Sequence, residues 1–254
     1  MDHAMNTDLY TYVLRQADNA MILCQRLCQW VAKGPELEED IALTNIGLDM
    51  IGQARSLYQY AASLSDENIS EDDLAFMREE REWRNLLLVE QPNGNFADTI
   101  ARQYFYDVWH LAFLEQLQHS KDKTLAAVAA KSVKESRYHI RHSSSWVKRL
   151  GDGTELSNQR MQAGIDEMWT YTPELFESDD LDQRMLHIGV GADLTSVKRV
   201  WDEHIAATLK EANLRQPDPA FQLSGGRYGM HTQHMGYLLA EMQILPRSMP
   251  SCEW

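Results

Sequence analysis

Cysteine is scarce in this sequence, with three residues among 254. Cys24 and Cys28 lie four positions apart in a helical pattern, and one helical turn does not present two sulfurs in good disulfide geometry. We therefore interpret both as small core residues, while Cys252 lies in the tail. A sparse, odd number of cysteines excludes a disulfide-stabilised scaffold and is typical of a reducing cytosol.

Long apolar runs are absent as well. No stretch approaches the roughly 18 residues that a membrane span needs. The N-terminal MDHAMNTD lacks the basic-then-apolar pattern of a secretion signal. The sequence therefore predicts a cytoplasmic protein with no membrane partner.

Basic residues are in the minority: 24 Lys and Arg stand against 38 Asp and Glu, which gives a net charge of −14. A protein that binds the phosphate backbone of nucleic acids needs a basic face, so this balance argues against a nucleic-acid partner. The excess of acids favours solubility and identifies no partner by itself.

Strand signals are nearly missing, since no two-residue alternation is bounded by hairpin turns. Apolar residues instead recur at three- and four-residue spacing, which predicts helices. Four of these helices are long and form two pairs, and the pairs are joined by the segment 65–95. The predicted fold class is therefore all-α, a ferritin-like four-helix bundle of two antiparallel helix pairs with one long crossover.

We expect a single domain over 1–254, with the core bundle at about 7–150 and a helical extension at about 151–254. The expected helices cover about 7–32, 36–64, 72–89, 96–120, 124–150, 155–175, 194–213 and 231–246.

Acidic residues lie near the middle of each long helix: Asp18, Asp49, Asp107 and Glu135. A di-metal carboxylate bundle takes one Glu from each of two helices and a Glu-x-x-His pair from each of the other two. The i,i+3 spacing places both ligands of a pair on one face of the helix. The four acids thus resemble such a site, and we expect them, with a polar stripe around Asn45 and Asp49, to face the bundle interior.

The ligand pattern is incomplete. Three residues after Asp49 stands Gly52, which has no ligand atom, and three residues after Glu135 stands Tyr138. His139 comes one position late, turned about 100° around the helix axis. Because iron sites of this kind use imidazole beside carboxylate, we interpret these residues as a degenerate pseudo-site, with no metal, cofactor or catalytic residue expected on this chain.

Arginines close to the four acids in sequence could compensate their charge in place of a metal. Buried carboxylates with too few cations around them repel one another unless they are protonated or paired. The candidate partners are Arg15, Arg55, Arg102 and Arg137.

Two C-terminal features have weaker signals. His231 and His234, with Glu241 further along, have metal-like spacing, but zinc takes three or four ligands and no further one is evident. The glycine-rich segment 224–229 contains Arg227 and lacks the spacing of either nucleotide fingerprint. A role of this loop in holding coenzyme A is the weakest of the hypotheses considered.

Several long strings are distinctive: PELEEDIALTNIGLDMIGQARSLYQYAASL, NLLLVEQPNGNFADTIARQYFYDVWH, KESRYHIRHSSSWVKRLGDGT and GMHTQHMGYLLAEMQ. They closely resemble the C subunits of the bacterial ring 1,2-phenylacetyl-CoA epoxidases. The resemblance runs from about residue 8 to Trp254. It implies a ferritin-like fold and a place in a multicomponent monooxygenase of aerobic phenylacetate breakdown.

The resemblance also implies a division of labour among subunits. A homologous catalytic A subunit holds the di-iron site and binds phenylacetyl-CoA. A reductase subunit with FAD and an iron–sulfur cluster brings electrons from NADPH, and a small B subunit joins the assembly. The role implied for this chain is that of a structural, activating partner of the A subunit without a metal of its own. Gly52 and Tyr138, where the pattern asks for His, agree with that role.

The alternative hypothesis is a divergent di-iron or di-manganese oxygenase that is active in its own right. Its ligands would come from Asp18, Asp49, Asp107, His110, Glu135 and His139.

Overall fold

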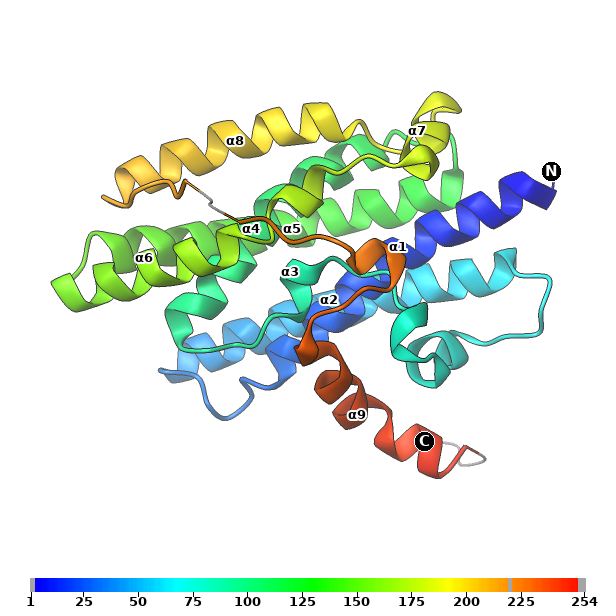
Figure 1. Cartoon of the computed structure of the whole chain (residues 1–254), viewed down its shortest axis with the longest axis horizontal. Coiled ribbons are helices and arrows are strands. Elements are labelled where there is room, and N and C mark those ends of the chain that lie inside the picture. Colours follow the sequence, from blue (N-terminus) through cyan, green and yellow to red (C-terminus); the bar gives the residue numbers. More distant parts are fainter. Residues whose placement is uncertain (1–2, 219–220, 251–254) are drawn as a thin grey trace. The chain divides into compact units, whose positions relative to one another are not determined.

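The computed structural model describes residues 3–218 and 221–250, which form helices and loops with no strand (Figure 1). The all-α prediction is therefore confirmed for the described residues. No helix among them combines the length and the apolar character needed to cross a membrane. The chain divides into two compact units, residues 1–91 with 225–254 and residues 92–224. The longer helices are α1 (His3–Cys28), α2 (Leu37–Leu64), α4 (Phe96–Leu117), α5 (Lys123–Gly151), α6 (Glu155–Trp169), α8 (Leu194–Glu211) and α9 (Gln233–Ser248).

The first unit is built on α1 and α2, which run side by side in opposite directions (Figure 1). The Asn6 side-chain amide donates to the carbonyl of Leu64, and the Tyr58 hydroxyl on α2 donates to the Asp18 carboxylate on α1. The pairing therefore joins the start of α1 to the end of α2. The first turn of α2 carries Glu38, Glu39 and Asp40, which favour a helix N-terminus electrostatically.

The segment 65–91 is irregular, so the predicted helix at 72–89 is wrong. It contains a π-helical turn (Asp73–Met77), a 3-10 turn (Glu80–Glu82) and the short α3 (Leu87–Glu90). Tertiary contacts replace the expected helical hydrogen bonds: the Leu86 amide donates to the buried Asn19 side chain over 2.8 Å, and the Arg84 amide donates to Asp18. Each such bond satisfies a backbone donor that a regular helix would direct to its own carbonyls.

The C-terminal segment returns to the first unit. A short 3-10 turn (Gly226–Tyr228) precedes α9, and the turn lies against Asn85, where a Cβ on Gly226 would collide with the Asn85 carbonyl. Gln243 on α9 donates to the Arg78 carbonyl over 3.0 Å. Part of the predicted helical extension thus belongs to the same unit as the N-terminal helices.

The second unit is organised around α4, which is buried on nearly all sides. It packs antiparallel to α5, with Asp107 opposite Ser143 and Phe96 edge-on to Trp146 at 5.0 Å between ring centroids. A helix that is apolar around its circumference needs neighbours on several faces, and α6 and α8 supply them. The Trp201 indole of α8 donates to the Phe105 carbonyl over 3.0 Å.

The buried faces of α4 and α5 differ in the size of their side chains. The α4 side contributes Tyr106, Trp109 and Phe113, whereas the buried face of α5 includes Ser132, Ser136 and Ser143. Small residues on α5 let α4 approach closely, and Ser136 and Ser143 lie against His110 and Asp107 of α4. This packing fixes which face of α5 is left for solvent.

The four long helices agree with the predicted ones to within a few residues at each end. The assembly of the two antiparallel pairs into one bundle, and the single domain over 1–254, stay predictions. The sequence analysis missed the short helix α7 (Asp180–His187), which starts with a capping box at Asp179. It was also wrong on Cys28, which is exposed at the end of α1, 3.9 Å from the sulfur of the buried Cys24.

The N-cap of α4 gives a first testable prediction. The Asn95 side chain accepts from the Ala97 amide over 2.8 Å, and Asp98 accepts in return from the Asn95 amide. We expect Asn95→Ala to lower the free energy of unfolding by about 1 kcal/mol, because it leaves a helix N-terminal donor without its acceptor. Asn95→Asp keeps the acceptor and should stay close to wild type in urea unfolding. An equal loss in both variants would contradict a capping role.

Candidate functional site

Asp18 lies in the interior of the first unit and its carboxylate is fully engaged by protein donors. Tyr58 donates from α2 over 2.7 Å, and the Arg84 amide donates over 2.8 Å. Arg78 forms a two-point ion pair, with one nitrogen 3.0 Å from Oδ2 and the other in close contact with Oδ1. Both carboxylate oxygens therefore accept hydrogen bonds from this chain alone.

The electrostatics match this geometry. Burial is the largest single influence and lowers the pKa of Arg78, but the Asp18 carboxylate together with Tyr58 and Tyr10 outweighs burial, and the pKa is raised. The guanidinium also lies 4.3 Å from the centre of the Trp83 ring, a cation–π arrangement. The charge that a metal would supply to Asp18 in a di-iron protein is supplied here by arginine.

Asp49 and Gly52, the predicted partners of Asp18 on α2, are only half-buried. Asn45, on the same stripe, is exposed. The expected inward polar stripe on α2 is therefore wrong: Ile46, Met50 and other apolar residues occupy the buried face instead. A Cβ added to Gly52 would meet no atom within 4 Å, so the missing side chain leaves open space.

Asp107 is the buried acid of the second unit. It accepts hydrogen bonds from Gln103 over 2.7 Å and from Ser143 on α5 over 2.7 Å. Burial raises the pKa of Asp107 to about 6, although His139 and the two hydrogen bonds act in the opposite direction. Burial also lowers the pKa of His110, to about 3, with His139 adding to the effect. The cluster is a buried polar network with a carboxyl that is easily protonated.

Glu135 and Tyr138 are less buried than Asp107 and His139. Glu135 is half-buried, with one oxygen 3.9 Å from the ammonium of Lys131. Tyr138 is exposed, and its ring stacks on His142 with 6.3 Å between centroids. Of the three candidates on α5, only His139 is fully buried. The ring of Tyr138 therefore does not take the place of a missing ligand in the interior.

The arginines near these acids in sequence have other partners. Arg55 pairs with Glu71, Arg102 donates to Asn93, and Arg137 pairs with Glu115. The sequence analysis missed Arg78, the cation that binds Asp18, because it expected a regular helix there. The sequence signal that could have indicated this role of Arg78 is its position in a segment where the helical periodicity is interrupted.

The described residues do not fit a di-iron centre. No group of three or more His, Cys, Asp and Glu side chains among them is placed to hold a metal ion. Asp18 is saturated by arginine, tyrosine and a backbone amide. We derive no chemistry through a metal on this chain.

A second buried cluster ties the C-terminal segment to α3. Glu90 is fully buried and accepts from the Thr232 amide over 2.6 Å and from Asn85 over 2.9 Å. His231 places Nδ1 2.8 Å from Glu90 and Nε2 3.2 Å from the Trp83 carbonyl. Burial opposes the charged imidazole, but the Glu90 carboxylate prevails and raises the pKa of His231. Both ring nitrogens are thus engaged in structural contacts and not offered to a metal with His234.

The glycine-rich loop is packed in a similar way. Arg227 is buried, and Gly226 lies against the backbone at Asn85. Gly225 and Gly229 have φ values of 134° and 76°, in the region that favours glycine. The glycines therefore serve a tight turn, and a contact with coenzyme A stays a prediction.

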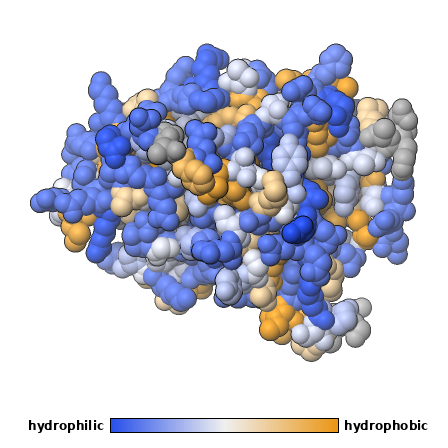
Figure 2. Space-filling view, viewed as in Figure 1, coloured by the Kyte–Doolittle hydropathy of each residue, from blue (hydrophilic) through white to orange (hydrophobic). Residues whose placement is uncertain are grey.

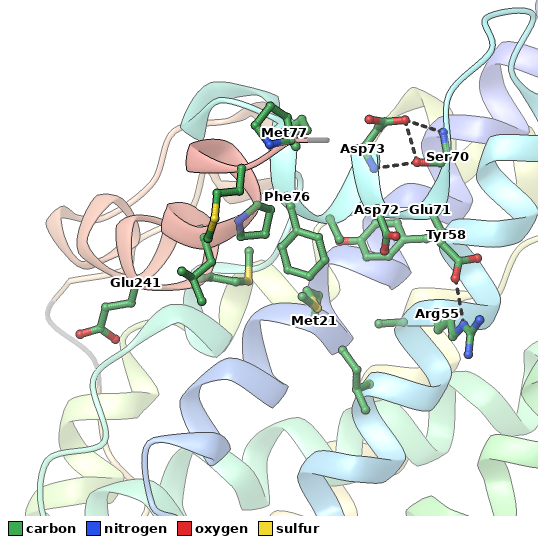
Figure 3. A pocket seen from close by; sticks show the side chains of 18 residues that line it. Met21, Arg55, Tyr58, Ser70, Glu71, Asp72, Asp73, Phe76, Met77 and Glu241 are labelled. Atoms are coloured by element: carbon green, nitrogen blue, oxygen red, sulfur yellow. Dashed lines mark hydrogen bonds and ion pairs between the residues drawn. The ribbon is translucent and has the colours of Figure 1, made fainter. Parts of the chain in front are cut away.

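A groove of about 770 Å³ lies in the first unit, between α2, the segment 70–77 and the end of α9 (Figure 3). Phe76 and Met21 line its apolar floor, and an ion pair between Arg55 and Glu71 lies at its rim. Figure 2 shows apolar side chains gathered at this end of α9, where Ile244 and Leu245 are exposed on a largely hydrophilic face. Because the rim is rich in carboxylates, the groove disfavours phosphate-bearing ligands. Its acidic residues are Glu71, Asp72, Asp73 and Glu241.

Comparison with known proteins agrees with the sequence resemblance. A family model described as phenylacetic acid catabolic protein matches residues 1–254. The chain belongs to this family. Its members are ferritin-like, in accord with the all-α structure.

A close relative in Escherichia coli (strain K12) is named as the C subunit of 1,2-phenylacetyl-CoA epoxidase. It is 50% identical over 246 residues, which cover 97% of this chain and 99% of the relative. The similarity to these epoxidase subunits that the sequence strings predict is therefore confirmed, and it extends over both units.

The Asp18–Arg78 pair gives the second prediction. Asp18→Leu should lower the free energy of unfolding by about 3–5 kcal/mol, because it leaves a buried guanidinium without its counter-charge. The double variant Asp18→Leu/Arg78→Met removes both charges and should recover a large part of that loss. Urea unfolding of the four proteins of this cycle measures the coupling. If the free energy of unfolding of Asp18→Leu lies within about 0.5 kcal/mol of the wild-type value, the ion pair does not stabilise the fold as proposed.

Asp107 gives a prediction of pH dependence. Its pKa of about 6 in the folded protein exceeds the value of about 3.9 for an unfolded chain, so the folded state binds the proton more tightly. Wild type should therefore lose about 3 kcal/mol of stability from this group as pH rises from about 3 to about 7. Asp107→Asn should remove that loss from urea unfolding curves.

The matched control for Asp107→Asn is Asp202→Asn, on the exposed part of α8. It should keep the wild-type pH dependence. The assignment to Asp107 is wrong if Asp107→Asn and wild type lose stability in parallel across this pH window.

Proposed function

We propose that this chain is a non-catalytic, metal-free component of a multicomponent phenylacetyl-CoA 1,2-epoxidase, and that it pairs with a homologous di-iron catalytic subunit in the cytoplasm. The single observation that carries the proposal is its 50% identity, over almost its full length, to a protein named as the C subunit of that epoxidase. Partner subunits are implied by that name.

The metal-free part of the proposal is supported by the state of the buried acids. Asp18 accepts hydrogen bonds on both oxygens from this chain, and Arg78 supplies a positive charge beside it. Asp107 accepts hydrogen bonds from Gln103 and Ser143. A di-iron site needs four carboxylates and two imidazoles free to ligate, which these contacts oppose.

The role that remains is to bind and position the catalytic subunit. The substrate phenylacetyl-CoA would contact that subunit, and electrons would reach it from a reductase subunit with FAD and an iron–sulfur cluster. The small B subunit is the last of the proposed partners. Within this set, the present chain acts through its surface and its rigidity.

Size-exclusion chromatography with metal analysis tests this proposal. The chain mixed with the catalytic subunit should elute as a stable complex. The chain purified alone from iron-supplemented cells should contain far less than the two irons of a di-iron centre. About two irons per isolated chain would instead support an independent oxygenase.

Asp49→Ala and Glu135→Ala separate the two functions further. In the proposed epoxidase component they leave the iron content of the complex unchanged, because neither residue is a ligand. In an independent oxygenase that uses these acids, each would remove metal and activity together.

A further inference from the structure

The helix α5 is strongly basic in an acidic protein. Its 29 residues carry seven Lys and Arg and one acid, Glu135, which gives a helix charge of +6 in a chain of −14. Surface helices normally mix both signs and gain stability from i,i+4 pairs. The imbalance on α5 therefore indicates a function beyond solvation.

The basic residues share the face opposite the buried one. At 100° per residue, Lys123, Lys134 and Arg141 fall within about 20° of one direction, with Arg137 and Lys148 within about 40°. We call these five residues the basic stripe. It extends over about 38 Å, from 25 residues at 1.5 Å each. The opposite face of α5 packs on α4 through serines, His139 and other buried residues.

Much of the positive charge has no acid beside it. Arg137 pairs with Glu115 at the edge of the stripe, and Lys148 pairs with Glu211. Within the described part of the chain, Lys123, Lys134 and Arg141 form no ion pair. The middle of the stripe is thus a surface of uncompensated positive charge.

Tyr138 stands beside the middle of this stripe. It is 39% exposed, and the guanidinium of Arg141 lies 5.6 Å from its ring centre. Toward the N-terminal end of the helix, the exposed residues Ala127 and Ala130 are small and would let another helix approach closely. Tyrosine and arginine dominate the energetics of many protein interfaces.

The spacing of the charges indicates what kind of ligand fits. Lys134 and Arg141 are two turns apart, about 10 Å along the axis. A phosphate site instead directs several donors at one point. A long line of separated cations beside an exposed tyrosine matches an extended face with carboxylates at similar spacing, such as an acidic helix of a protein.

We propose that the basic stripe, with Tyr138, is the docking surface for an acidic helical face of the catalytic partner subunit. This inference rests on the proposed function. Positive charge on α5 steers the partner by long-range attraction, and the contact around Tyr138 and Arg141 then holds it in register.

Charge reversal tests the proposal. Lys134→Glu/Arg141→Glu should weaken binding to the purified catalytic subunit about 100-fold, since like charges opposed across an interface strongly disfavour association. The wild-type Kd should rise steeply with salt, and that of the variant should rise less. The control is Arg199→Glu/Lys210→Glu, an equal charge change on the exposed side of α8, which should bind within about twofold of wild type. Thermal melting checks that both variants fold.

The outcomes of this experiment are distinct. Failure of wild type to bind the catalytic subunit overturns the proposed function and this inference with it. If wild type binds and both double variants weaken binding equally, only the assignment to α5 is overturned. The assignment to α5 is also overturned if the α5 variant keeps its affinity for the catalytic subunit but no longer self-associates in sedimentation. It is likewise overturned if that variant keeps its affinity for the catalytic subunit but loses affinity for phenylacetyl-CoA. Those results would identify a second copy or the thioester as the occupant.

Discussion

The first unit depends on the burial of one carboxylate, Asp18 on α1. A buried charge is tolerated only when it is paired and hydrogen-bonded, so cations and donors must be brought to it. The chain supplies Arg78 and the Arg84 amide from the segment after α2, and that segment gives up regular helix to reach Asp18. The same path places Glu90 where it binds Thr232 and so fixes the start of α9.

The second unit solves the same problem differently. Asp107 accepts from two neutral donors, Gln103 and Ser143, and burial moves its pKa upward toward neutrality. One acid is therefore paired with a cation, and the other accepts hydrogen bonds from two neutral donors. Both solutions keep polar groups inside a helical protein of the phenylacetic acid catabolic family without requiring a metal.

The long helices could be predicted from the sequence because apolar periodicity and terminal residues such as Asn95 and Gly34 are local signals. The prediction failed at 72–89. There Arg78 binds Asp18, 60 residues earlier in the chain, and Asn85 packs against Gly226 in the C-terminal segment. Apolar periodicity carries no information about such long-range contacts. It also misjudged which faces of α2 and α5 are buried. Residues such as Gly52 and Tyr138 lie at the margin of a helix face, where a turn of about 100° per residue decides between interior and solvent. Their outward position required the packing partner to be known.

The orientation of α5 determines which of its residues can take part in function. Glu135 and His139 suggest a ligand helix, yet the interior face of α5 consists chiefly of small residues and serines. The charged residues of α5 lie on the other faces of the helix, where the basic residues outnumber the single acidic residue, Glu135. The inner face of α5 thus packs in the interior, and its basic outer face is the part of this helix that we propose to bind the partner subunit.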